Sequence, residues 1–326
     1  MLSRVAESLF WTARYVERAE DVTRLLDVDY HALLDAHVAD HGEAWHRLVS
    51  LLGEDAAYRE HYDAFTAQNV AEWLLWHDGN PNAVVSCVTT ARENARSVRE
   101  QISGEMWEAI NGLFLLVGRA NRRAVTRGPH AFFEQVRNGA HRFQGCADAT
   151  MTHGEPYEFI QLGLHLERAA TTVRVVRSRY PLAVALADDD PARAYELIAL
   201  LKSCSAFEAY VKRHGATFEP LDIAEALVRS GQFPRAALYC LRTCAEAVAR
   251  IAGDQGAPQR VLGRLCADIE YGETGDASGA GVAATLGELL AGIHRAGDAL
   301  TKAFFSSRAL PASAVSIQEG QQQQCG

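Results

Sequence analysis

Glutamate and arginine side chains on long helical segments are the residues of this sequence that could do chemistry. The segment Tyr15–Ala19, followed by Arg24, recurs as His165–Ala169, followed by Arg174, at a constant offset of 150 residues. A carboxylate can act as a general base, and guanidinium groups bind carboxylate or phosphate through paired hydrogen bonds. The repeated pattern is therefore compatible with an ion network, a ligand site or an active site.

The segment around Glu167 is predicted to be a buried helix. Apolar residues spread around nearly the whole helical wheel there, while Glu167 and Arg174 share one arc. Removing an unpaired carboxylate from water costs several kcal/mol, so we expect arginines such as Arg14, Arg92, Arg96 or Arg174 to pair with Glu167. Two interpretations stay open: a closed structural ion network, and a polar cleft that binds an amino-acid-like or phosphorylated ligand.

The first predicted helix has a charged arc opposite its aliphatic side. Glu17 and Arg18 lie in this arc, and the aromatic residues Phe10 and Trp11 lie within or beside it. A fully solvated face has little reason to carry two large aromatic side chains, so part of the arc is expected to meet protein or ligand. The alternative is a solvated face with local ion pairs such as Arg14 with Glu17.

These patterns define a set of candidate site residues. The candidates for a catalytic carboxylate are Glu17, Glu93 and Glu167. The candidates for ligand binding are Arg14, Tyr15, Arg18, Arg92, Arg96, Arg168, Arg174, Tyr210, Arg213 and Arg235.

Familiar catalytic and metal motifs are absent from the sequence. It contains no GxxxxGK[ST] phosphate loop, GxGxxG turn, GxSxG elbow or HExxH pair. Glu43-x-x-His46, beside His37 and His41, has the spacing of a di-iron bundle motif but is expected to lie on the surface. We therefore predict neither metal nor cofactor. An enzyme with a glutamate general base and arginine substrate clamps, or a metal-dependent helical bundle, remains an alternative to a binding protein.

The composition is that of an ordinary globular protein. The chain has 326 residues, 48% of them hydrophobic, and a formal net charge of -9, so no overall positive field favours nucleic acid or anionic lipid. No apolar run is long enough to span a bilayer, and the N-terminal segment does not have the pattern of a signal peptide. Seven scattered cysteines are typical of a reducing compartment. These features predict a cytoplasmic protein with no nucleic-acid or membrane partner, and they leave a homo-oligomer open.

Helical periodicity dominates the sequence and predicts an all-α fold of about ten or more helices. Three of the longest are predicted over Ser3–His41, Ala83–Ser103 and Glu105–Thr126. We expect one helical domain over residues 1–310, with similar halves at 1–150 and 151–310, and a disordered low-complexity tail over 311–326.

Four segments together resemble the bacterial alpha-E family over about residues 1–310. They are Ser3–Glu20, Ala91–Arg96, Phe159–Ala169 and Phe233–Arg235. The resemblance implies an all-helical protein with an ExxR motif, matched here by Glu93 and Arg96. It also implies genes beside those for circularly permuted ATP-grasp ligases and transglutaminase-like proteins. One of these is accordingly the expected partner, in a pathway that makes or modifies peptides or amide-linked metabolites.

Overall fold

Capping residues and chain breaks divide the long helical periods into shorter helices than the sequence predicts. The computed structural model describes all residues except 36–40, 253–255, 273–277 and 307–326, so the predicted tail lies outside the described residues. The described part of the first helix is Ser3–Asp35, and His41 is the first residue of the next helix. The segment predicted as one helix over Glu105–Thr126 breaks after Gly118, because Asn121 accepts a hydrogen bond from Ala124 N and starts a new helix.

The described residues form fifteen α-helices and no strand, which confirms the all-α prediction. In chain order the helices are α1 Ser3–Asp35, α2 His41–Leu52, α3 Asp55–Arg59, α4 Ala67–Leu75, α5 Val84–Ser97, α6 Gly104–Gly118, α7 Arg122–Arg127, α8 His130–Thr150, α9 Glu155–Ala185, α10 Pro191–Ser203, α11 Phe207–His214, α12 Pro220–Val228, α13 Ala237–Ala252, α14 Ala257–Tyr271 and α15 Gly279–Leu300. A 3₁₀ turn, Arg99–Gln101, follows α5, and a π-helical turn, Thr301–Phe305, follows α15.

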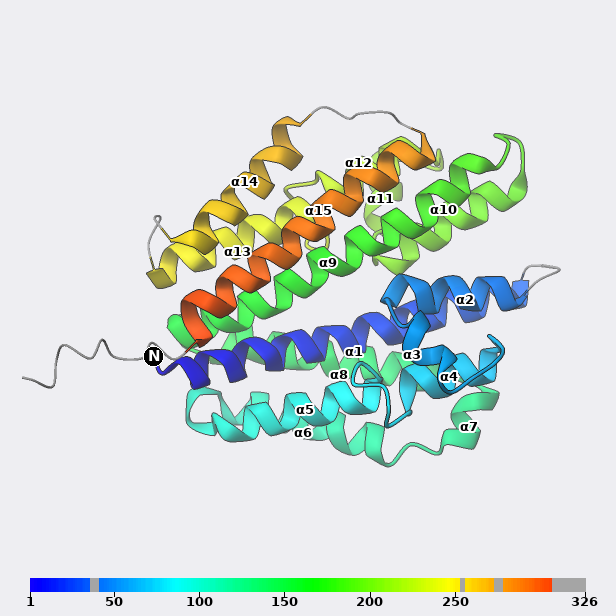
Figure 1. Ribbon diagram of the computed structural model, residues 1–326. Helices are drawn as coiled ribbons and strands as arrows, with labels where there is room; N and C mark the ends of the chain where they lie inside the picture. Colours follow the sequence, from blue (N-terminus) through cyan, green and yellow to red (C-terminus); the bar gives the residue numbers. More distant parts are fainter. Residues whose placement is uncertain (36–40, 253–255, 273–277, 307–326) are drawn as a thin grey trace, which may run out of the picture.

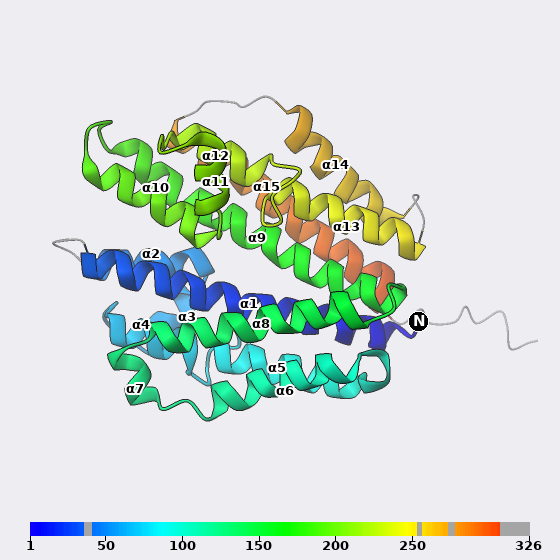
Figure 2. The same ribbon diagram turned by 180° about the vertical axis from the view of Figure 1, so that it is seen from behind.

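Two long helices, α1 and α9, run side by side through the middle of the molecule (Figures 1 and 2). On one side α1 packs with α5 and α8, and α6 packs on both of these helices; on the other side α9 packs with α13 and α15, and α14 packs on both of those. The two four-helix groups therefore meet along α1 and α9. Residues on these two helices that face each other are shielded from water by both groups.

A small residue lets the two central helices approach closely. A Cβ atom added to Gly163 on α9 would lie 2.2 Å from the carbonyl oxygen of Phe10 and 3.2 Å from the Cβ of Ala13, both on α1. Any side chain at position 163 would therefore push α1 and α9 apart. This contact lies one turn from Glu167, so it also fixes how near the charged residues of the two helices can come.

The turns that follow α2 and α10 have the same local structure. Gly53 and Ser205, which follow α2 and α10, both have positive φ, at 77° and 52°. The tyrosine five residues further on then donates its hydroxyl proton to a loop carbonyl in each case, Tyr58 to Ala64 and Tyr210 to Thr217. The division of residues 1–310 into two halves stays a prediction, but these turns allow positions in the two groups to be matched.

Candidate functional site

The two Glu-Arg pairs on α1 and α9 bind each other. Arg168 Nε on α9 donates to Glu17 Oε1 on α1 at 2.7 Å, and Arg18 Nε on α1 donates to Glu167 Oε1 on α9 at 2.7 Å. Glu17 and Glu167 are 0% and 1% exposed, so both carboxylates lie between the helices. The reciprocal exchange explains why the sequence pattern recurs, because each central helix supplies the cation for the other.

Glu167 is neutralised by two arginines from the opposite helix. Arg14 Nη2 lies 2.6 Å from Glu167 Oε2, and the Arg18 guanidinium contacts both carboxylate oxygens. Burial opposes ionisation of Glu167, but Arg14 and Arg18 outweigh it and hold the pKa of this carboxyl well below its usual range. Glu167 is therefore an anion in the folded protein.

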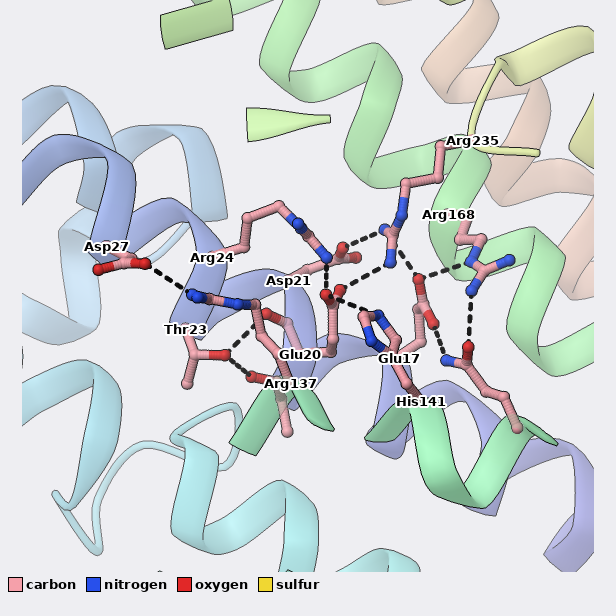
Figure 3. Close-up of polar contacts among 12 residues, drawn as sticks. Glu17, Glu20, Asp21, Thr23, Arg24, Asp27, Arg137, His141, Arg168 and Arg235 are labelled. Atoms are coloured by element: carbon pink, nitrogen blue, oxygen red, sulfur yellow. Dashed lines mark hydrogen bonds and ion pairs between the residues drawn. The ribbon is translucent and has the colours of Figure 1, made fainter. Parts of the chain in front are cut away.

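A group of acidic side chains on α1 surrounds one arginine from the other half (Figure 3). Arg235 lies in the turn before α13, and its guanidinium contacts Glu17 at 3.0 Å, Glu20 at 2.8 Å and Asp21 at 3.0 Å. Arg24, one turn along α1, also pairs with Glu20. We call Glu17, Glu20, Asp21, Arg24, Arg168 and Arg235 the acidic network.

Asp21 is the member of the acidic network whose charge is least compensated. It is 3% exposed, and its Oδ2 atom has no hydrogen-bond partner among the described residues. Burial and the neighbouring Glu17 raise the pKa of Asp21 to about 7, although Arg235 acts in the opposite direction. The candidate set missed both Asp21 and Glu20. The signal for them was their helical spacing from Glu17, which places them on the same buried face of α1.

A polar cavity of about 120 Å³ lies beside Glu167, between α1, α9 and the segment around α2 and α4. We call it the polar cavity. Its charged and amide-bearing walls are Arg18, Asp21, Glu54, Asn82, Glu167 and Arg174. Glu54 and Asn82 come from loops before α3 and α5, and nothing in their sequence context marked them in advance. The interface therefore combines buried ion pairs with a space large enough for a small molecule.

The predicted Glu93 group lies away from this interface. Glu93 on α5 is about half exposed and pairs with Arg92 at 2.6 Å and with Arg96 at 2.7 Å. The hydrogen bond from Arg96 is the main cause of the lowered pKa of Glu93. Arg92 packs over the ring of Phe114. These three charged residues form a surface cluster on α5 and do not pair with Glu167.

The remaining candidates divide between the interface and the periphery. Tyr15 on α1 is half-buried beneath the guanidinium of Arg18, and burial raises its pKa. Tyr210 stacks on His214 within α11, and Arg213 on the same helix is exposed. The structure therefore brings Arg14, Tyr15, Arg18, Arg168, Arg174 and Arg235 to the α1–α9 interface and leaves Tyr210 and Arg213 outside it.

Two groups of described residues have ligand atoms close enough together for a metal ion. Glu17, Glu20 and Asp21 form one, but the Arg235 guanidinium already occupies the space among them. Asp27, His31 and His130 form the other, and there Arg137 donates to Asp27 at 2.8 Å. His46 of the sequence-predicted cluster pairs with Asp55 at 2.7 Å, and His37 lies outside the described residues.

A larger groove of about 850 Å³ runs between α12, α14 and α15. Its walls include aliphatic side chains such as Leu265, Ile269 and Leu286, together with arginines. None of the candidate site residues contributes to it. None of the described helices combines the length and hydropathy needed to cross a membrane.

Comparison with known proteins identifies relatives and a family for the chain. Two proteins described as uncharacterized, from Mycobacterium bovis and Mycobacterium tuberculosis, are each 26% identical to the chain over 318 residues. The match covers 89% of this chain but 35% of each relative, so the chain spans about a third of their length. No solved structure matches the chain.

The matching family is described as a predicted alpha-helical domain with a conserved ER motif. This differs from the ExxR pair that the sequence analysis matched to Glu93 and Arg96. The sequence contains two Glu-Arg dipeptides, Glu17-Arg18 and Glu167-Arg168, and both lie at the α1–α9 interface. The family's sequence pattern matches residues 1–305, and the chain therefore belongs to the Alpha-E family.

Proposed function

We propose that this protein is an accessory protein that binds an amino-acid-like or peptide-like ligand in the cytoplasm. The ligand belongs to a pathway in which an ATP-grasp ligase forms amide bonds or a transglutaminase-like protein modifies peptides. The observation that carries the proposal is the polar cavity, because it joins buried carboxylates and guanidinium groups to a space of about 120 Å³. Amino acids and peptide ends carry the complementary charges.

The pKa values of the candidate carboxylates favour a binding role over catalysis. Arginine partners lower the pKa of Glu17 and of Glu167 against the effect of burial, and Arg96 lowers the pKa of Glu93. A carboxylate with a lowered pKa holds a proton less readily and is a weaker general base. The enzyme alternative, with one of these three glutamates as the base, is therefore less well supported.

Partner binding has separate support from the relatives. In both mycobacterial proteins the matched region is about a third of a longer chain. A region that is covalently joined to further sequence in its relatives is well suited to act beside another protein. The partner we propose is the circularly permuted ATP-grasp ligase or the transglutaminase-like protein implied by the family resemblance.

The proposed partnership can be tested by copurification and by kinetics. The tagged full-length protein is expected to recover one of these two partners from its native cells. Adding the purified protein to the recovered ligase is expected to change ligase turnover or its KM for the amino substrate. If neither partner is recovered and ligase kinetics do not respond, the proposed function is wrong.

A further inference from the structure

The turn that carries Arg235 has a counterpart in the other half of the molecule. Pro81-Asn82 precedes α5 and Pro234-Arg235 precedes α13, and in both places two turn residues and one bend lead into the helix. The shared hydrogen bonds are Ala83 N to Asn80 O (3.1 Å) and Ala236 N to Phe233 O (2.9 Å). Asn82 therefore occupies the position that corresponds to Arg235, and its short side chain ends in an uncharged amide.

The central helices show a second difference at corresponding positions. The offset of 150 residues matches Arg24 with Arg174, and it matches Glu20, the partner of Arg24, with Ala170. Arg174 therefore lacks a carboxylate one turn before it. Among the described residues no carboxylate lies within ion-pair distance of Arg174, and its hydrogen-bond contact is His294 Nε2 at 3.5 Å.

In the acidic network, Glu20 pairs with Arg235. The corresponding positions hold Ala170 and Asn82, which cannot form an ion pair, and the polar cavity lies beside Asn82. Asn82 and Arg174 both contribute to its walls. The cavity thus has a guanidinium without a paired carboxylate on one wall and no counterpart of the Arg235 cation on another.

Two buried carboxylates in the cavity walls also lack a full set of partners. Glu54 is 6% exposed, and its carboxylate accepts a hydrogen bond from the Asn82 amide at 2.7 Å. Asp21 Oδ2 is buried and has no partner among the described residues. A neutral amide compensates a buried anion only in part, so an entering cation would be stabilised at these two side chains.

We infer that the polar cavity binds a small zwitterion, with the ammonium group beside Asp21 and Glu54 and the carboxylate at Arg174. This inference rests on the proposed function, which it narrows to a ligand class. The ammonium group of the ligand would take the role that the Arg235 guanidinium has in the acidic network. The carboxylate of the ligand would take the role of Glu20. A cavity of about 150 Å³ can hold a benzene molecule, so the volume here fits glycine or alanine and not an amino acid with a large side chain.

Thermal unfolding and calorimetric titration of the purified full-length protein test the inference. Glycine and alanine at millimolar concentration are expected to raise the unfolding temperature and to give saturable binding. Acetate alone, methylammonium alone and tryptophan are the matched probes, and each is expected to bind at least about tenfold more weakly than glycine. Acetate that binds as tightly as glycine, or a folded protein that binds neither glycine nor alanine, overturns the inference.

Two variants locate the binding. Glu54→Gln keeps the size of the side chain, and Arg174→Gln shortens it but keeps a polar end; each removes one charge from the cavity wall. Each is expected to weaken glycine binding by about tenfold or more, with circular dichroism confirming that the fold is retained. Glu93→Gln, on the surface of α5, is the control and should bind glycine as the wild type does. Unchanged binding in both cavity variants would place the ligand elsewhere and overturn the inference.

A failed copurification beside intact glycine binding removes the pathway assignment and leaves the cavity assignment standing. Absence of glycine binding together with an intact ligase complex removes the cavity assignment and leaves the pathway assignment standing.

Discussion

The acidic network and the polar cavity lie on the same pair of helices, but they balance charge in different ways. In the acidic network, Arg235 fills the space among Glu17, Glu20 and Asp21. In the polar cavity, Asn82 stands at the position corresponding to Arg235, and a space of about 120 Å³ remains. One shared framework can therefore hold either a closed ion cluster or a binding site. The two sites differ at two corresponding positions, Arg235 against Asn82 and Glu20 against Ala170.

The largest effect is expected from removing the cation at the centre of the acidic network. Arg235→Met keeps much of the side-chain volume but leaves three buried carboxylates without this guanidinium. We expect a loss of about 3–5 kcal/mol in the free energy of unfolding, measured by urea denaturation. Arg213→Met, at an exposed arginine on α11, is the matched control and should unfold like the wild type.

If Arg235→Met costs no more than Arg213→Met, the acidic network does not hold the two halves together. The contrast with the polar cavity would then lose its physical basis.

A smaller loss is expected at Glu167, which joins the polar cavity to the ion pairs. Glu167→Gln keeps one hydrogen-bond acceptor, replaces the other with a donor and removes the counter-charge that Arg14 and Arg18 share. The two arginines are partly exposed, so water compensates some of the loss. We expect about 2–3 kcal/mol in the same unfolding experiment. An unchanged stability would mean that these buried pairs contribute little net energy.

Asp21 should give an effect of opposite sign that depends on pH. Burial and the neighbouring Glu17 raise its pKa to about 7 in the folded protein, from an ordinary value near 3.8. Glu167 also raises the pKa of Asp21, whereas Arg235 and the Thr171 hydroxyl lower it. The folded state then binds more protons than the unfolded state between these values. Ionisation of Asp21 therefore lowers stability as pH rises from about 4 to 7.

Asp21→Asn removes this loss while keeping an acceptor for Arg235. We expect the stability advantage of the variant over the wild type to be larger near pH 8 than near pH 5, by roughly 2–3 kcal/mol. Unfolding curves at the two pH values measure the difference. A stability difference that is the same at both would mean that Asp21 does not titrate in this range.

The smallest effect is expected at the surface cluster on α5. Glu93 is paired with Arg92 and Arg96 but is about half exposed, so solvent screens these contacts. Glu93→Gln should unfold at the same denaturant concentration as the wild type. A clear loss of stability would mean that a surface ion pair here matters as much as the buried ones.

Sequence patterns were sufficient to predict the all-α fold and to mark Glu17-Arg18 and Glu167-Arg168 as important pairs. The all-apolar wheel around Glu167 predicted a buried helix, and the repeat of Glu17-Arg18 as Glu167-Arg168 predicted that similar central helices carry the charges. The first follows from periodicity along a single helix, and the second from comparing two segments of the sequence. The pairing across the interface could not be predicted as fully: Arg14 pairs with Glu167 as expected, but Arg18 does so as well, and Arg92 and Arg96 pair with Glu93 instead.

The polar cavity could not be predicted in the same way. Glu54 and Asn82 reach it from separate loops, and neither loop carries a helical period that would mark a buried polar side chain. Conversely, Glu93-x-x-Arg96 has the spacing of an ion pair on any helix, and that spacing does not distinguish a buried pair from an exposed one. The missing information was tertiary: which loop end lies against which helix.

The most direct test of the contrast is to give the polar cavity the side chain that closes the acidic network. In Asn82→Arg, we expect the new guanidinium to reach Glu54, the present partner of Asn82, on the side of the cavity where we place the ammonium group of the ligand. Unfolding temperature, measured with and without glycine, should rise with glycine in the wild type and stay constant in the variant. An equal rise in both proteins would contradict the account, because glycine would then bind without using the space that Asn82 leaves.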